Sequence, residues 1–169
     1  KSTFANLLPR LMDPSAGAIT VNGTDVRNFD PDTLRSHIGF VPQSAYLFSG
    51  TIASTVSGVD DPSPEQRARV ERALEGAQAK EFVSLIEDGL DTRVDPGGRN
   101  FSGGQRQRLT MARALYKAAD LYVFDDSFSA LDYATDAAIR NNLTTYVGGA
   151  AVLIVAQRFA TIRHADQIL

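Results

Sequence analysis

The sequence predicts an α/β domain with a mostly parallel sheet flanked by helices and with a helical subdomain inserted in the middle. Two apolar runs, 121–124 and 151–155, are typical of strands buried on both faces, and a helical stretch lies between them. Residues from about 51 to 116 follow a mostly helical pattern, which places the inserted subdomain. With 169 residues, one domain is long enough to bury a core.

Composition and charge exclude several classes of protein. Hydrophobic residues make up 43% and charged residues 22%, which is the composition of a globular rather than a disordered chain. The 17 basic and 20 acidic residues give a net charge of −3, so we expect no nucleic-acid partner. The absence of cysteine excludes disulfides, thiolate metal sites and thiol catalysis. The longest apolar run, 150–156, is far shorter than the roughly 20 residues that cross a bilayer.

Short elements alternate in the first 50 residues. In order, we expect a helix over 4–11, a hairpin over 18–26, a helix over 32–36 and a buried strand over 38–41. Pro9 should disturb the first helix, because proline lacks a backbone N–H. Asn22-Gly23 is a typical hairpin turn, and Pro42 closes the buried strand.

Helices dominate the remaining sequence. Ser63 can cap a helix whose first position is Pro64, and Gln66 completes a capping box. The apolar positions of this helix, at helical spacing, are Val70, Leu74 and Ala77. Further helices are expected over 80–86, 103–116 and 134–146, and a last strand over Gln167, Ile168 and Leu169.

Two carboxylates, Asp125 and Asp126, follow the buried run 121–124. In open α/β sheets, ligands bind at the carboxyl ends of the strands, so the first acid lies where a ligand is expected. A carboxylate there can hold Mg²⁺ directly or through water, while its neighbour faces a reacting group. A strand that ends in two solvated turn acids is the alternative for an isolated pair.

Lys1-Ser2-Thr3 opens the first expected helix and has the composition that ends a phosphate-binding loop. The Lys1 ammonium would reach the β- and γ-phosphates, the Ser2 hydroxyl would ligate Mg²⁺, and the helix N-terminus would favour an anion. Because no glycine-rich segment precedes Lys1 in this sequence, a chance Lys-Ser-Thr is the alternative.

Ser102-Gly103-Gly104-Gln105 has the spacing of a capping box and could simply begin a helix. Two consecutive glycines in a first turn, however, cost about 1 kcal/mol each relative to alanine. A helix start that is only structural has no reason to accept that cost. Glycines allow close approach to the backbone, and exposed amides at a helix start suit a phosphate.

Together these segments resemble the motifs of ATP-binding cassette (ABC) ATPases, in the family's order and over essentially the whole chain. The matching segments are Lys1-Ser2-Thr3 (end of Walker A), Gln43 (Q-loop), Ser102 to Gln105 (signature), 121–126 (Walker B), Ser129-Ala130-Leu131-Asp132 (D-loop) and 155–158 around Gln157 (switch, or H-loop). The resemblance implies the P-loop NTPase fold, with a RecA-like core at 1–50 and 117–169 and a helical, signature-bearing subdomain at about 51–116.

The same resemblance implies ATP and Mg²⁺ as cofactors and gives each matching residue a role. The implied ATP-binding residues are Lys1, Ser2, Thr3, Gln43, Ser102, Gly103, Gly104, Gln105 and Asp132, of which Ser102 to Gln105 would bind the ATP of a partner domain. The implied magnesium ligands are Ser2, Gln43 and Asp125, and the implied catalytic residues are Lys1, Asp126 and Gln157.

The surroundings of Gln43, at 34–43 and 47–52, resemble those of exporter-type domains. This resemblance implies a fused transmembrane domain, a location at the cytoplasmic face of the cell membrane, and a surface over 43–52 that receives a coupling helix. Ordinary core packing is the alternative for Phe48 and Ile52. Asp95-Pro96-Gly97-Gly98 departs from the Gly-Glu-Arg-Gly-like run that exporters often carry there.

Two further departures fall on catalytic positions. Asp126 replaces the usual glutamate and is one methylene shorter, and a misplacement of about 1 Å can cost roughly 10²-fold in rate. Gln157 replaces the switch histidine and can neither become cationic nor relay a proton. Together they resemble the degenerate half of a heterodimeric exporter, with a weakly hydrolytic Walker side and an intact signature that serves a non-identical partner.

Two other functions remain open from the sequence. One is an ABC ATPase of repair or translation without a membrane part, and the other is a nucleotide-gated regulatory subunit that does not hydrolyse ATP. Because the chain begins at Lys1 without methionine and stops within an expected strand, we expect a piece of a longer polypeptide that lacks its transmembrane domain and its Walker A glycine loop. By itself this piece is expected to be poorly stable and inactive.

Overall fold

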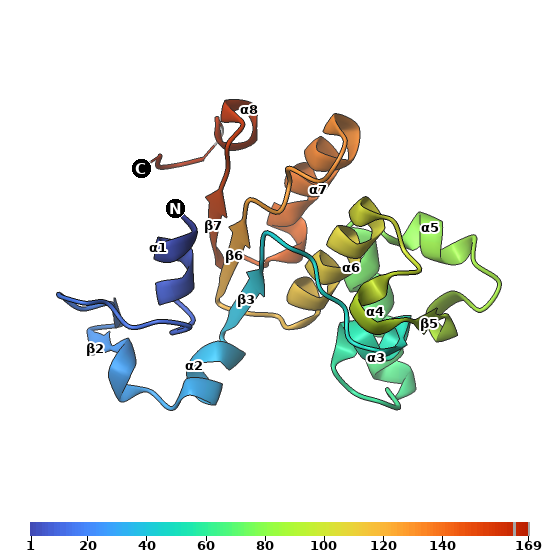
Figure 1. Cartoon of the computed structure of the whole chain (residues 1–169), viewed down its shortest axis with the longest axis horizontal. Coiled ribbons are helices and arrows are strands. Elements are labelled where there is room, and N and C mark those ends of the chain that lie inside the picture. The colour runs from blue at the N-terminus through green and yellow to red at the C-terminus, as the bar shows by residue number, and fades with distance from the viewer. Residues whose placement is uncertain (164, 169) are drawn as a thin grey trace.

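The computed structural model describes residues 1–163 and 165–168, and a three-stranded parallel sheet lies at its centre (Figure 1). The sheet has the order β3 (Ile38–Val41), β6 (Leu121–Asp125) and β7 (Ala151–Val155). Ile38 lies opposite Leu121, and Asp125 lies opposite Val155. Because all three strands run in the same direction, their carboxyl ends meet at one edge, as the α/β prediction requires.

One side of the sheet carries the N-terminal elements. They are α1 (Ser2–Leu7), β1 (Thr20–Val21), β2 (Thr24–Asp25), a short 3₁₀ turn (Val26–Asn28) and α2 (Pro31–Ser36). A small core joins them to the sheet through Ala5, Val26, Leu34, Ile38 and Val123. The hairpin turns at Asn22-Gly23 as expected, with Val21 opposite Thr24. Helix α1 is shorter than the expected 4–11, because Pro9 has no N–H to extend it.

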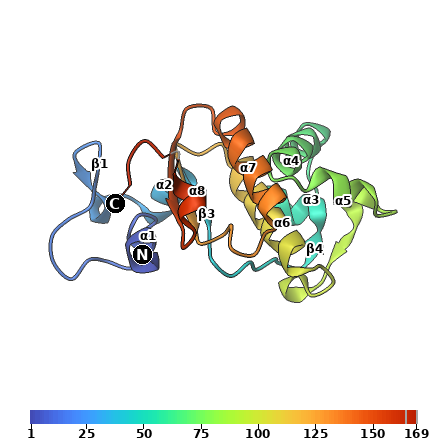
Figure 2. The same cartoon turned by 90° about the horizontal axis from the view of Figure 1, so that it is seen from above.

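The other side carries the helical region. It contains α3 (Ile52–Ser57), α4 (Pro64–Gly76), α5 (Lys80–Ser84), α6 (Gly103–Tyr116) and an antiparallel pair, β4 (Gly50–Thr51) with β5 (Arg93–Val94). Two 3₁₀ turns, Gly89–Asp91 and Pro96–Gly98, lie on either side of β5. Seen from above, α6 stands between α4 and the sheet, and α1 lies on the opposite side of the sheet (Figure 2).

A large core holds the helical region against the sheet. Its fully buried members include Val41, Leu74, Leu109, Met111, Phe124 and Ile139. Gly76 shows how close the elements approach, because a Cβ there would lie 2.8 Å from the ring of Tyr146 on α7 (Tyr133–Tyr146). Ser63 and Gln66 form the expected capping box, and Val70, Leu74 and Ala77 are buried as predicted.

Three expectations need correction. Strand β7 is not buried on both faces: Ala151 and Val152 are exposed, because in the described part of the chain β7 pairs only with β6 and forms an edge. The helix expected over 80–86 ends at Ser84. Gln167 and Ile168 form no strand, since no described strand lies beside them to supply the ladder of hydrogen bonds. Leu169 lies outside the described residues. The chain ends with α8 (Phe159–Ile162) and an irregular segment.

Candidate functional site

The carboxyl edge of the sheet gathers side chains from four separate segments. Lys1 and Ser2 come from the start of α1, the two acids from the end of β6, Gln43 from the segment after β3, and Gln157 from the segment after β7. These residues are far apart in the sequence; the parallel strands bring three of the segments to one edge, and the start of α1 lies beside it. The acids therefore do not form a solvated turn.

Ser2 and Asp125 form one half of this site. The Ser2 hydroxyl donates a hydrogen bond to Asp125 Oδ1 over 2.9 Å, and Asp125, the last residue of β6, is only 4% exposed. Lys1 Nζ donates to the carbonyl oxygen of Ala156 over 2.9 Å, which places the ammonium beside the end of β7. Thr3 is exposed on the first turn of α1.

Asp126 forms the other half. Its Oδ2 accepts hydrogen bonds from Gln157 Nε2 over 2.6 Å and from Gln43 Nε2 over 3.3 Å. Its backbone has φ +46°, a left-handed conformation that aspartate tolerates better than most residues, and its N–H donates to Val155 O. The turn at Asp126 thus points its carboxylate, 6% exposed, toward both glutamines.

The donor set suits a magnesium ion. A hydroxyl and a carboxylate side by side are hard oxygen ligands, and Mg²⁺ is held by one or two carboxylates together with water and substrate phosphates. The described residues contain no group of three or more histidine, cysteine, aspartate or glutamate side chains that could hold a metal ion. Gln43, the third implied ligand, bonds to Asp126 in this structure.

The segment between β6 and α7 is fixed by its own hydrogen bonds. Ser127 is fully buried, and its hydroxyl donates to Val41 O at the end of β3. Asp132 caps α7 by accepting hydrogen bonds from the N–H groups of Ala134 and Thr135 and from the Thr135 hydroxyl. The bonds from Thr135 lower the pKa of Asp132.

Ser102 to Gln105 lie on the other side of the sheet from α1 (Figure 1). Ser102 and Gln105 form the capping box that the spacing predicts, and α6 begins at Gly103. Neither glycine is closely packed against the rest of the described chain: outside the helix's own backbone, a Cβ at Gly103 would meet nothing nearer than 4.0 Å, and one at Gly104 nothing nearer than 3.7 Å. Packing within this chain therefore does not explain them.

The apolar residues near Gln43 divide between surface and core. Ile52 is fully buried, as the packing alternative required, whereas Phe48 is 65% exposed. The ring of Tyr46, also exposed, meets Phe48 edge to face at 5.4 Å between centroids. Below them, the buried Gln107 of α6 donates to Pro42 O over 3.4 Å, which connects α6 to the segment that carries Gln43.

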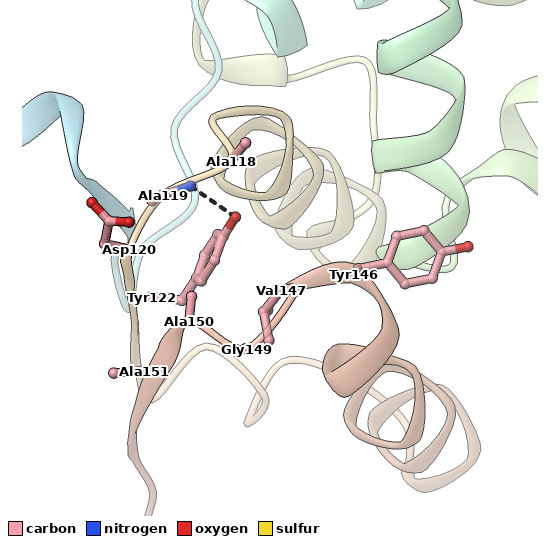
Figure 3. Close-up of a pocket in the computed structure, with 10 residues that line it drawn as sticks. Ala118, Ala119, Asp120, Tyr122, Tyr146, Val147, Gly149, Ala150 and Ala151 are labelled. Atoms are coloured by element: carbon pink, nitrogen blue, oxygen red, sulfur yellow. Dashed lines mark hydrogen bonds between the residues drawn. The ribbon is translucent and has the colours of Figure 1, made fainter.

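A hollow at the opposite edge of the sheet contains none of the expected site residues. It lies at the amino ends of β6 and β7 and is lined by Ala118–Asp120, Tyr122 and 146–151 (Figure 3). The Tyr122 hydroxyl accepts a hydrogen bond from the Ala119 N–H over 3.0 Å, and burial raises the pKa of this tyrosine. The Tyr122 hydroxyl is thus bonded to the backbone of the same chain, and none of the motif residues faces this hollow.

Sequence reasoning missed the part played by Arg158. Its Nη2 donates to the carbonyl oxygen of Ser129, and its guanidinium stacks on the ring of Tyr133. The sequence shows only that an arginine follows Gln157. Nothing in the spacing indicates that its side chain reaches the segment after β6, because that contact depends on how β6 and β7 pair.

Comparison with known proteins agrees with the geometry. Residues 1–129 match the ABC transporter family. An uncharacterized ABC transporter ATP-binding protein of Mycobacterium tuberculosis (strain ATCC 25618 / H37Rv) is 48% identical over the whole of this chain, which covers 29% of that protein. The ATP-dependent lipid A-core flippase of Burkholderia orbicola is 43% identical over the whole chain, which covers 28% of the flippase.

A solved structure shows the same fold. The chain superimposes on a bacterial Atm1-family ABC exporter with ATP bound, with a TM-score of 0.90 and 35% identity over 98% of this chain and 29% of the exporter. The chain belongs to the ABC transporter family and has the fold of its P-loop ATPase domains. It spans less than a third of the length of these relatives. No helix in the described residues is long and apolar enough to cross a membrane.

Proposed function

We propose that this chain is the ATP-binding and ATP-hydrolysing part of an ABC exporter. The observation that carries the proposal is the convergence of Lys1, Ser2, Asp125 and Asp126 at the carboxyl edge of a parallel sheet. That edge is where α/β folds bind ligands, and an ammonium, a hydroxyl and a carboxylate are the groups that a Mg-triphosphate requires. The relatives named above support the exporter class.

Each residue at the edge has a proposed task. Lys1 would release the Ala156 carbonyl and pair with the β- and γ-phosphates, and Thr3 would face them from the first turn of α1. Ser2 and Asp125 would hold Mg²⁺, with Gln43 turning from Asp126 to join them. When bound, the ion would neutralise charge on the phosphates as water attacks the γ-phosphorus in line.

The hydrolytic side of the site is proposed to be weak. Asp126 has a shorter reach than the glutamate usual in the family, and its Oδ2 is already engaged by two amides. An amide donates a hydrogen bond but carries no proton from water to phosphate. The short bond from Gln157 to Asp126 therefore favours slow turnover at this chain's own site. The same bond also fits a subunit that binds ATP without hydrolysing it, which is the second candidate.

The start of α6 is proposed to act on another molecule. A Cβ at Gly103 or Gly104 would make no close contact within this chain, so packing does not require either glycine, while Ser102 and Gln105 already hold the first turn in shape. We infer that this surface covers the ATP bound by a second domain of the same family, a non-identical subunit, with Asp132 in the adjacent loop. The domain would thus close head to tail on its partner when ATP is bound.

The proposal that this chain works with a transmembrane domain is supported by the exporter relatives and by the exposed surface at Tyr46 and Phe48. A transmembrane domain would dock through its coupling helices on the exposed aromatic pair Tyr46 and Phe48, at the cytoplasmic face of the cell membrane. Residues 1–50 and 117–169 would form the RecA-like core, and about 51–116 the helical subdomain. The piece 1–169 alone would lack the partner surface and be inactive.

Binding of Mg-ATP to the full-length protein, assembled with its partner in lipid nanodiscs, tests the proposal. Lys1→Ala removes the ammonium that meets the phosphates, and we expect ATP affinity at this chain's site to fall by at least about tenfold. Lys117→Ala is a matched control, because Lys117 bonds to the Arg35 and Ile38 carbonyls far from the edge cluster. Equal affinity in the Lys1→Ala and unmodified proteins would contradict the proposal.

A further inference from the structure

The backbone that carries the exposed rings of Tyr46 and Phe48 is held by neighbouring elements. Leu47, between the two rings, is fully buried, and its carbonyl accepts a hydrogen bond from the Gly97 N–H over 3.0 Å. The Phe48 carbonyl accepts a hydrogen bond from the Thr55 hydroxyl of α3 over 3.1 Å. The position of this segment is therefore fixed, while both rings remain on the surface of the described chain.

Arg113 of α6 contacts both aromatic residues. Its Nη1 donates a hydrogen bond to the Tyr46 carbonyl over 3.3 Å, and its guanidinium carbon lies 5.8 Å from the centroid of the Phe48 ring. Aromatic residues and arginine are enriched at the centres of protein interfaces and carry much of their binding energy. An arginine that contacts two exposed aromatic residues is therefore typical of a surface that another protein covers.

The charge of Arg113 is not balanced within this chain. Among the described residues, no carboxylate lies within ion-pair distance of its guanidinium. Burial lowers the pKa of Arg113, and no nearby acid raises it again. Burial also lowers the pKa of Arg108 on the same helix, but there the charges of Asp132 and Glu81 raise it. A half-buried cation without a counter-ion is costly, and a carboxylate beside it would offset that cost.

A second cation on the same helix adds to this imbalance. Lys117, one turn after Arg113, donates hydrogen bonds to the carbonyls of Arg35 and Ile38 rather than to a carboxylate. Burial lowers the pKa of Lys117, and the charge of Arg113 lowers it further. Two like charges thus lie one turn apart on α6, and no described carboxylate pairs with either. This part of the surface is complementary to a negatively charged group.

We propose that the helix of the transmembrane domain that docks on Tyr46 and Phe48 carries an aspartate or glutamate that pairs with Arg113. This inference rests on the proposed function, which supplies the transmembrane domain as the docking partner. A guanidinium has several N–H donors, so the bond to the Tyr46 carbonyl leaves others for the two oxygens of a carboxylate. Arg113 then contributes to the choice of partner, because a docking helix with a neutral or basic residue at this place leaves the cation unpaired.

Two cross-linking measurements on the full-length protein, assembled with its partner in nanodiscs, separate the docking from the ion pair. In the first, p-benzoylphenylalanine replaces Phe48, and mass spectrometry identifies the segment captured on irradiation. We expect a cytoplasmic loop of the transmembrane domain. If no such loop is captured, the docking part of the proposed function fails and this inference fails with it.

The second measurement tests the ion pair itself. Arg113→Lys places an amine at this position, and a water-soluble carbodiimide joins that amine to a carboxylate in contact with it. We expect an amide bond to an aspartate or glutamate of the captured loop. The matched control is Arg72→Lys, at an exposed position of α4, which should form no amide with that loop. If the loop is captured at position 48 but residue 113 forms no amide with it, the inference is overturned while the docking stands.

Charge reversal gives a readout that a purely structural role of Arg113 would not produce. We expect Arg113→Glu to lower the yield of the position-48 photo-cross-link at least about threefold relative to Arg113→Gln, because like charges repel across an interface. Tm and ATP binding should be the same in both variants. Replacement of the identified carboxylate by lysine should restore the yield in Arg113→Glu.

Equal yields in the two variants of Arg113 would overturn the inference. So would yields that fall only as Tm falls, since that result would show that Arg113 merely stabilises the segment. If Arg113→Glu does not assemble, the amide formed by Arg113→Lys decides.

Discussion

Two regions of the molecule that carry site residues are built in opposite ways. At the carboxyl edge of the sheet, Ser2, Asp125, Asp126 and Gln157 bond to one another across long stretches of sequence. At the start of α6, Ser102 and Gln105 bond within one turn, and neither of the two glycines between them is closely packed. The fold brings the first region together from distant segments, whereas the second is formed within one turn, and we propose that it acts on another molecule.

The largest expected effect separates the two regions by function. Ser102→Arg puts a long cation over the start of α6, and we expect ATP turnover of the assembled transporter to fall by about 10²-fold or more, since donors aimed at the developing charge carry that much rate. ATP binding to the Lys1 side should change less than about twofold. ATP turnover and equilibrium ATP binding, measured on the same preparation, check the expected fall in rate and the expected unchanged binding. Equal loss of binding at both sites would count against the trans role of Ser102.

Two glycine substitutions distinguish an open glycine from a packed one by their effects on the free energy of unfolding. Gly104→Ala should raise the free energy of unfolding by about 0.5–1 kcal/mol, because the helix gains propensity and the Cβ meets nothing closer than 3.7 Å. ATP turnover should nevertheless fall, because the added Cβ would stand where we propose that the partner's nucleotide binds. Denaturant unfolding of the assembled protein and ATPase rates measure the two effects.

Gly76→Ala is the contrasting variant. The new Cβ would lie 2.8 Å from Cγ of Tyr146 and 3.0 Å from Cδ1 of Leu115, so these side chains or their helices must shift. We expect a loss of about 1–3 kcal/mol in the free energy of unfolding, measured in the same denaturant series, as overpacked sites show. If Gly76→Ala and Gly104→Ala changed stability alike, the distinction between a packed and an open glycine would be wrong.

The smallest expected effect concerns Asp132, in the loop between the two regions. Hydrogen bonds from Thr135 hold the pKa of Asp132 below its ordinary value. Its contribution to stability is therefore present above the unfolded-state pKa and is lost as the pH falls through the folded-state pKa. Thr135→Val removes the hydroxyl donor and should raise this pKa toward the ordinary value. The pKa of the Asp132 carboxyl can be measured by NMR titration of both proteins. An unchanged pKa in Thr135→Val would contradict the role given to the Thr135 hydroxyl.

Local patterns in the sequence predicted much of the fold. Ser63 and Ser102 begin helices where their capping boxes indicate, because a cap depends only on residues within one turn. The apolar run 121–124 likewise predicted β6, because the run itself is visible in consecutive residues. The exposure of Val152 was not predictable, since an edge strand and a central strand have the same apolar run and differ only in their neighbours.

The candidate site shows the same division. Strand direction predicted that Asp125 would lie at a ligand-binding edge, and the hydrogen bond from Ser2 agrees with that prediction. The bonds from Gln157 and Gln43 to Asp126 required the tertiary structure, because they depend on the pairing of β7 with β6 and on the left-handed turn at Asp126. The contact of Arg158 with Ser129 was not predictable either, because it also depends on the pairing of β6 with β7.

Repair of the hydrolytic side tests the central claim most directly. In the full-length protein assembled with its partner, Asp126→Glu and Gln157→His are combined, and ATP turnover at saturating Mg-ATP is measured against the unmodified protein. A carboxylate one methylene longer and a proton-relaying imidazole should make the second site competent, so turnover per transporter should rise. Equal hydrolysis at both sites of the unmodified protein, with no gain from the double substitution, would contradict the account.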